Sequence, residues 1–471
     1  MMQPHKLLMT MVMLAMALYG KTQKTERKIH SVSAIQAIDL ALKHRAEILN
    51  ARLDIDNQVA FNKEITGLAL PQVAGNIAAF HNFNIPVTVL PDFISPSVYG
   101  VLEDNGVKDG NGNPIKWDGI INTFPAQFGV PWQASLSASV KQILFQPDVF
   151  IALKARSAAV ELYENQLNVA VDSVKSNVYN TYFGVLVSEK GLEFASESQL
   201  RLKKLLKEQQ ELFKNGFIEK LDIEKTQVNL NNISTSVIRL ENMVATSYAG
   251  LKFALALPQL DSLHLTDELT EEWVKRDIFD MSNDFKYDQR PEIKTLETTE
   301  ELQTLQVRRY KMAGLPTIAA QWNVGTSAQR QRLNFLDTGD RWFYSNTLGV
   351  NLSVPITDGF QRHNRVKQAE YTLEKTRNTK KQFEQYIDFQ VMNARISLTN
   401  AIAAYNNQQE NKELAEKVFN TTRIKYEQGL GSSFEVLQAE NDLQVALNNY
   451  YSSLYGAGIA RIAYMRALGK L

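Results

Sequence analysis

Proline is absent from two long stretches of this chain, and this constrains the fold more than any other feature. All thirteen prolines lie at or before Pro355, and none falls between Pro147 and Pro258. Proline inside a helix removes a hydrogen bond and clashes with the preceding turn, so proline-free stretches can hold long helices. The segment from Phe360 to Tyr426 also lacks glycine, and as one helix it would extend on the order of 100 Å.

Each proline-free stretch has a glycine-containing turn near its middle, and the two turns resemble each other. A shift of 213 residues places Gly429 on Gly216 and Glu435 on Asp222. Glycine readily adopts the positive φ that a chain reversal needs. We therefore expect two antiparallel helical hairpins, at about 148–257 and 359–468.

The returning arms of both hairpins carry apolar residues at seven-residue spacing. The rows are Leu443, Tyr450, Ala457 and Tyr464 in the second arm, and Leu230, Val237, Val244 and Leu251 in the first. This spacing predicts coiled-coil-like packing between helices. The chain therefore contains a duplicated unit.

Four segments outside the hairpins alternate between apolar and small polar residues. They lie at about 71–84, 131–146, 316–328 and 342–356. Such segments are typical of a transmembrane β-barrel, although a water-soluble sandwich with one buried face shows the same alternation. Four strands cannot close a barrel, and an open edge in lipid leaves backbone groups unpaired. In a membrane, several copies of the chain must therefore share one barrel.

The N-terminus has the composition of an export signal. His5 and Lys6 precede the apolar run Leu7–Leu18, which is too short to span a bilayer, and small residues follow. We expect a secretory signal peptide at residues 1–20; a buried terminal helix is the alternative. No later run of apolar residues predicts a transmembrane helix.

Composition and motifs exclude several classes of function. The chain has no cysteine, which excludes disulfides, thiolate sites and a lipoprotein anchor, and its 51 basic and 51 acidic residues argue against a nucleic-acid partner. Asp109, Asn111 and Asn113 are spaced as in a calcium loop, but Pro114 occupies the position of its glycine. The histidines are scattered, and no phosphate loop or nucleophile elbow is present. We expect no enzyme, no metal and no cofactor.

The order of the elements is an export signal, then twice a helix, a strand pair and a helical hairpin. Together with "LALPQVAG", "LFKNGFIEKLDI", "VNLSVPITDGFQRHNRVKQAE" and "YEQGLGSSFEVLQAENDL", this order resembles the TolC-type outer-membrane efflux protein family. The resemblance covers the mature chain. It implies a mainly α fold with a transmembrane β-barrel, built from repeats at 21–258 and 288–471 around an equatorial linker at 259–287.

The resemblance also implies a homotrimer whose twelve strands form one barrel in outer-membrane lipid, with the hairpins forming an α-barrel in the periplasm. Such a protein is a passive exit duct for efflux or type I secretion. Its partners are a periplasmic adaptor and an inner-membrane transporter of the RND or ABC type. The alternative is a structural or adhesive coiled-coil surface protein without a conducting lumen.

The resemblance places the two turns at a periplasmic tip that is closed at rest. Asp222 and Glu435 are then candidates for the pore constriction, where rings of acids would favour cations. Tyr426 is expected to form a hydrogen bond with Asp222. The plain alternative is that both acids simply favour a helix N-terminus.

Two positions depart from the family pattern. Gly431 stands where the family has an arginine, and Gln438 stands where it has a second pore acid. Arg423, one turn before Tyr426, is a candidate replacement for the basic residue.

The adaptor would grip the same tips. The candidate contacts, expected to be exposed, are Gly216, Phe217, Gly429, Leu430, Ser432 and Ser433. The alternative is that the glycines only supply positive φ and the hydroxyls only cap a helix.

Overall fold

The computed structural model describes residues 28–268, 270, 285–337, 339 and 341–471, so the expected signal peptide lies outside the described residues. The described residues fall into two compact units. The helical unit comprises the described parts of Met1–Val59, Ser157–Gln303 and Thr372–Leu471, and the sheet unit comprises Ala60–Arg156 and Thr304–Tyr371. Each unit contains parts of both sequence repeats.

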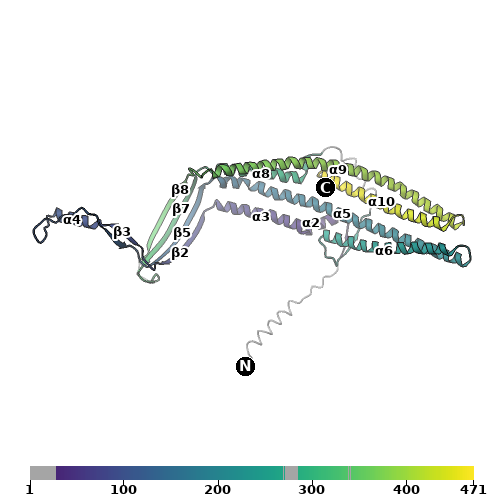
Figure 1. Cartoon of the computed structure of the whole chain (residues 1–471), viewed down its shortest axis with the longest axis horizontal. Helices are drawn as coiled ribbons and strands as arrows, with labels where there is room; N and C mark the ends of the chain where they lie inside the picture. Colours follow the sequence, from purple (N-terminus) through teal and green to yellow (C-terminus); the bar gives the residue numbers. More distant parts are fainter. Residues whose placement is uncertain (1–27, 269, 271–284, 338, 340) are drawn as a thin grey trace, which may run out of the picture. The chain divides into compact units, whose positions relative to one another are not determined.

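The elements are labelled in Figure 1. The helices are α2 (Ala34–His44), α3 (Ala46–Leu68), α4 (Ile94–Asp104), α5 (Pro147–Lys214), α6 (Lys220–Ala254), α8 (Pro291–Met312), α9 (Gln361–Glu427) and α10 (Ser433–Ala467), with a 3-10 turn η1 at Tyr287–Gln289. The strands are β1 (Ile29–Val32), β2 (Gln72–His81), β3 (Val87–Pro91), β4 (Thr123–Gln127), β5 (Trp132–Phe145), β6 (Ser262–Leu265), β7 (Thr317–Arg330) and β8 (Phe343–Ser353).

The two proline-free stretches form helical hairpins, α5–α6 and α9–α10. Helix α5 has 68 residues and α9 has 67, and the returning helices have 35 residues each. The predicted heptad rows face the interior: the buried members are Leu230, Val237, Leu251, Leu443, Tyr450, Ala457 and Tyr464. Among the described residues, no helix combines the length and apolar character needed to cross a membrane.

The main core of the helical unit lies where α2, α5, α6 and α10 meet. Tyr182, Leu251 and Leu454 are almost fully buried there. The Tyr182 hydroxyl donates to the carbonyl of Val32, 3.0 Å away, at the end of β1. Strand β1 pairs in parallel with β6, which connects the start of the first repeat to the segment after the first hairpin. Sequence alternation did not predict this short pair, since four-residue strands show too little of it.

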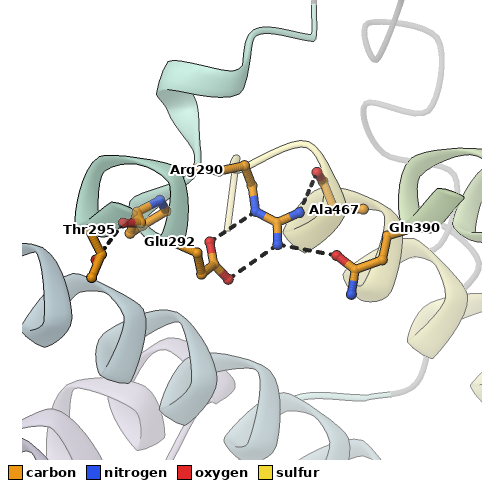
Figure 2. A network of polar contacts seen from close by, with 6 residues as sticks. Arg290, Glu292, Thr295, Gln390 and Ala467 are labelled. Carbon is orange, nitrogen blue, oxygen red and sulfur yellow. Dashed lines mark hydrogen bonds and ion pairs between the residues drawn. The ribbon is translucent and has the colours of Figure 1, made fainter. Parts of the chain in front are cut away.

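Buried Arg290, at the start of the second repeat, forms a hydrogen bond with the end of α10, the returning helix of the same repeat (Figure 2). Arg290 donates to both carboxylate oxygens of Glu292, at 3.1 and 3.2 Å, and to Gln390 of α9 at 3.3 Å. It also donates to the carbonyl of Ala467, 2.9 Å away, at the end of α10. Burial raises the pKa of Glu292, but the hydrogen bonds and the charge of Arg290 outweigh burial and lower that pKa. The network therefore favours an ionised Glu292.

The sheet unit contains a four-stranded antiparallel sheet in the order β2-β5-β7-β8, formed at the segments where alternation predicted strands. In two adjacent rows, its register aligns residues of one kind across all four strands. One row is apolar: Val73, Val140, Trp322 and Leu348. The adjacent row points to the opposite face and is small or polar: Ala74, Ser139, Asn323 and Thr347. The sheet thus has one apolar and one polar face.

The outer strands β2 and β8 each have a partner on one side only within the described chain. Every residue of β8 is exposed, including Leu348 and Val350 on the apolar face. Two free edges and an uncovered apolar face leave this sheet incomplete as a single chain.

The connection between β2 and β5 holds three further elements. Strands β3 and β4 pair in antiparallel fashion, and α4 lies between them in the chain. The candidate calcium residues form a turn, in which the Asp109 carboxylate accepts from the backbone N–H groups of Asn111 and Asn113, both at 2.9 Å.

Candidate functional site

The turns of the two hairpins have the same backbone geometry. Gly216 and Gly429 have φ of 78° and 73°, which ordinary side chains rarely adopt. In the second turn, Gly429 N–H donates to the carbonyl of Tyr426 and Leu430 N–H donates to that of Lys425, both at 2.9 Å. The first turn repeats both bonds with the equivalent residues. This pair of backbone hydrogen bonds is the Schellman motif, which ends a helix at a glycine.

One hydrogen bond links the tips of the two hairpins. The Ser433 hydroxyl donates to Asp222 Oδ1, 2.9 Å away, so the first turn of α10 is held to the first turn of α6. Ser433 is only 6 % exposed. Its expected exposure as an adaptor contact was therefore wrong, because this hydroxyl faces the neighbouring hairpin.

The expected bond between Tyr426 and Asp222 is not formed. Tyr426 packs beside the apolar cluster that includes Leu206 and Val436. Its buried hydroxyl, like both polar atoms of the buried Gln209 amide, completes no hydrogen bond of regular geometry in the described part of the chain. Burial raises the pKa of Tyr426, against a smaller lowering by Gln209, which faces the hydroxyl.

Glu435 is engaged in capping its own helix. Ser432 Oγ accepts from the Glu435 N–H at 3.3 Å, and Glu435 Oε2 accepts from the Ser432 N–H at 3.4 Å. This capping box satisfies two backbone donors at the start of α10. Glu435 therefore has the plain role of a helix N-terminal acid in this chain, and a role in the pore stays a prediction.

The two remaining polar candidates also bond within their own helices. Arg423 Nε lies 2.9 Å from Glu427 Oε1, one turn further along α9. The amide of Gln438 donates to Asp442 Oδ1 at 2.9 Å. Neither residue contacts Asp222 among the described bonds. A basic role for Arg423 at the tip thus remains a prediction.

Gly431 permits the close approach of the capping box. A Cβ at this position would lie 3.2 Å from Glu435 Oε2 and 3.4 Å from the backbone nitrogen of Tyr426. A side chain here would require the Glu435 carboxylate to move by a few tenths of an ångström. Glycine at position 431 therefore leaves room for the capping contact of Glu435.

The other adaptor candidates are accessible. Gly216, Gly429 and Ser432 are exposed, and the side chains of Phe217 and Leu430 are 76 % and 77 % exposed. A groove of about 980 Å³ lies between the ends of α5 and α9, with Lys207, Glu211, Phe217, Ile218, Tyr426 and Gly431 among its lining residues. Apolar and charged groups are thus available together at the tip.

A buried ion pair about two turns along α10 from the tip was missed by sequence reasoning. Arg201 of α5 donates through Nε to both carboxylate oxygens of Glu440, each 3.0 Å away. Glu440 is 2 % exposed, and the guanidinium also lies over the ring of Phe419, 5.7 Å from its centroid. A signal was available, since Glu440 falls in the apolar stripe between Val436 and Leu443.

Comparisons with known proteins agree on one class of protein. Residues 287–470 match the sequence model of a family described as outer membrane efflux protein. Outer membrane protein TolC of Salmonella enteritidis is 21 % identical over 349 residues, which are 72 % of this chain and 70 % of that protein. The family consists of channel proteins.

Solved structures match over nearly the whole chain. The outer membrane protein VceC of Vibrio cholerae aligns with a TM-score of 0.67 at 14 % identity, covering 93 % of this chain and 96 % of VceC. The CmeC outer membrane channel of Campylobacter jejuni gives 0.67 at 16 % identity, covering 93 % and 85 %. This likeness confirms the predicted fold class, a mainly α chain whose strands contribute to a β-barrel. Residues 287–470 thus match the outer membrane efflux protein family, and the chain as a whole shares the fold of these outer membrane channels.

Proposed function

We propose that this efflux protein is the passive exit duct of a tripartite efflux or type I secretion system. In this role it would receive substrates from a periplasmic adaptor and an inner-membrane transporter of the RND or ABC type. The observation that carries the proposal is the four-stranded sheet, which has an apolar face, a polar face and two free edges. Such a sheet can exist in lipid only when other copies pair with its edges and close it.

Three copies would supply twelve strands, with β8 of each copy beside β2 of the next. The row with Val140 and Trp322 would then face lipid, and the row with Ser139 and Asn323 would line an aqueous lumen. In these two rows, residues of one kind are in register across all four strands. At this level of the sheet, the alignment supports a continuous polar lining.

The duct would be closed at rest by the hairpin tips. Asp222 lies at the start of α6 and accepts from Ser433 of the second hairpin. Three copies of Asp222 around a pore would form a ring of like charge that favours cations, while the Ser433 bonds hold each protomer's two tips together. Glu435 and Gln438 would add to the constriction only if the capping contacts of Glu435 and the Gln438 bond to Asp442 were released.

The adaptor would bind the exposed apolar residues of the tips. Phe217 and Leu430 project from equivalent positions just after the two turn glycines, and the groove beside them is lined by Lys207 and Glu211. Large exposed apolar side chains with a polar rim are typical of protein contact sites. Adaptor binding there would contact the two hairpins that the Ser433–Asp222 hydrogen bond joins.

The test is reconstitution in a planar bilayer, with the oligomeric state of the same sample measured by native mass spectrometry. We expect a trimer that conducts small cations poorly at rest, and a loss of cation preference in Asp222→Asn. The matched control is Glu224→Gln, which removes an exposed acid of the same helix that pairs with Lys220 at 3.0 Å. A protein that conducts in no variant would support the structural surface protein instead.

A further inference from the structure

The segment between β2 and β5, residues 82–131, contains regular elements (Figure 1) but no interior of its own; we call it the insertion. Every residue of the insertion is described, and none of them is buried. Its β3–β4 ribbon has two strands only, and an isolated two-stranded ribbon is at best marginally stable in water. Folded elements without a core need a surface to pack on.

The insertion presents two uncovered apolar surfaces. On α4, Ile94, Val98 and Val101 lie on one face at spacings of four and three residues, and each is at least half exposed. On the ribbon, Val87 and Val89 share a face and are also more than half exposed. The rings of Phe93 and Phe124, 6.4 Å apart, form the aromatic contact between the start of α4 and β4.

The ribbon edges do not favour strand addition by another chain. Pro125 lies in the middle of β4, opposite Val89, and Pro91 ends β3. Proline has no backbone N–H to offer a new strand and is a common device for blunting an edge. A partner would therefore meet the insertion through side-chain faces rather than through backbone pairing.

The topology of the sheet indicates which partner is in reach. The insertion follows β2, a free edge of the sheet, and in the proposed trimer this edge pairs with β8 of the neighbouring copy. Strand β8 begins at Phe343, at the same end of the sheet at which β2 ends, as the register through β5 and β7 requires. The neighbour's β7–β8 connection therefore lies beside the insertion, and it carries the exposed side chains of Leu333 and Leu336.

We propose that the insertion is an interprotomer clasp, whose apolar face on α4 packs against the neighbouring copy of this chain at the outer end of the barrel. The clasp rests on the proposed trimeric duct. It gives each protomer a second contact with its neighbour, in addition to the strand edges. It also explains why the exposed apolar side chains of α4 can exist outside a core.

Cysteine labelling can test the clasp without any reaction at native cysteines, because the chain has none. In Val98→Cys the thiol lies on the apolar face of α4, and in the matched Glu103→Cys it lies on the opposite face, where Glu103 stands 3.9 Å from Lys116. In the intact detergent-purified trimer, we expect a bulky maleimide to label Glu103→Cys readily and Val98→Cys poorly. The difference should vanish after unfolding. Equal labelling in the trimer would overturn the clasp.

A photo-crosslinking amino acid at position 98 identifies the occupant. We expect an adduct of two copies of this chain that maps to the β7–β8 connection, and no such adduct from position 103. An adduct with another protein or with lipid, or none at all from a verified trimer, would overturn the clasp and leave the duct untouched. A purified protein that is monomeric by native mass spectrometry would overturn the proposed trimer and the clasp with it.

Discussion

The two hairpin tips share one turn but use the acid that follows it differently. Both turns have the same glycine geometry and the same pair of backbone bonds. In the second tip, Ser432 and Glu435 cap α10. In the first, the equivalent cap position holds Glu219, whose side chain makes no capping bond, and Asp222 reaches across to the other hairpin. The two turns thus share one backbone geometry, but the acid of the second caps its own helix, whereas the acid of the first accepts a hydrogen bond from the other hairpin.

The largest effect should come from the buried ion pair that joins α5 to α10. Arg201→Ala would leave the Glu440 carboxylate, which is 2 % exposed, without its partner, and breaking a buried pair typically costs about 3 kcal/mol or more of unfolding free energy. The repeat-equivalent positions, Gln227 and Leu414, are both exposed and form no such pair, so the asymmetry between the hairpins extends beyond the turn. Denaturant unfolding of the detergent-purified protein measures the loss.

The double variant Arg201→Met/Glu440→Leu distinguishes the contribution of side-chain packing to the free energy of unfolding from that of the charges. Replacing a whole buried pair by apolar residues is often close to neutral, so this variant should recover most of the stability. If Arg201→Ala alone costs nothing, the pair does not hold the hairpins together.

The next effect concerns the bond between the tips. Ser433→Ala removes the donor but keeps the Asp222 charge, while Asp222→Ala removes both the charge and the acceptor. Each should lower stability by about 1–2 kcal/mol, because a partly buried polar group loses its partner. Only Asp222→Ala should also change the cation preference of single channels. An equal change in Ser433→Ala would show that the bond, not the charge, sets ion preference.

Substitutions at the N-cap positions of α6 and α10 should change the stability of the protein in opposite directions. Ser432→Ala removes the capping box and should destabilise the protein by about 1 kcal/mol. Glu219→Ser supplies the missing cap and should stabilise it by about 0.5 kcal/mol or more. Thermal unfolding of the two variants measures both. A destabilising Glu219→Ser would mean that Glu219 has a contact outside the single chain.

The smallest effect is expected at Tyr426. Tyr426→Phe removes a buried hydroxyl without a regular hydrogen bond, so stability at neutral pH and the closed state should change little. The raised pKa of Tyr426 means that the protonated form favours folding. This contribution is present below the unfolded pKa of about 10 and is lost as the pH rises through the folded value. As the pH rises above about 10, Tyr426→Phe should therefore lose less stability than the wild type.

Most of the fold could be predicted because its periodicities are long. The absence of proline located the hairpins, and alternation located four strands whose register then aligned Val140 with Trp322. Short elements were missed, because β1 and β6, with four residues each, give too few residues for a period to appear. The turn geometry at Gly216 and Gly429 also followed from residue type alone.

The site was harder to predict because its contacts depend on how the hairpins pack. Ser433 and Asp222 are 211 residues apart, and nothing local favours Ser433 over Tyr426 as the donor. The capping box of Ser432 and Glu435 could be read from their spacing, and it was considered only as a plain alternative. Glu440 was overlooked although an acid in an apolar stripe signals a buried partner.

The most direct test of the account is the single-channel conductance of Asp222→Ala beside Glu435→Ala in the reconstituted trimer. If the first tip carries the gate and the second only caps its helix, Asp222→Ala should raise the resting conductance. Glu435→Ala should then conduct like the wild type. A larger rise in Glu435→Ala, or no current in any variant, would contradict the account.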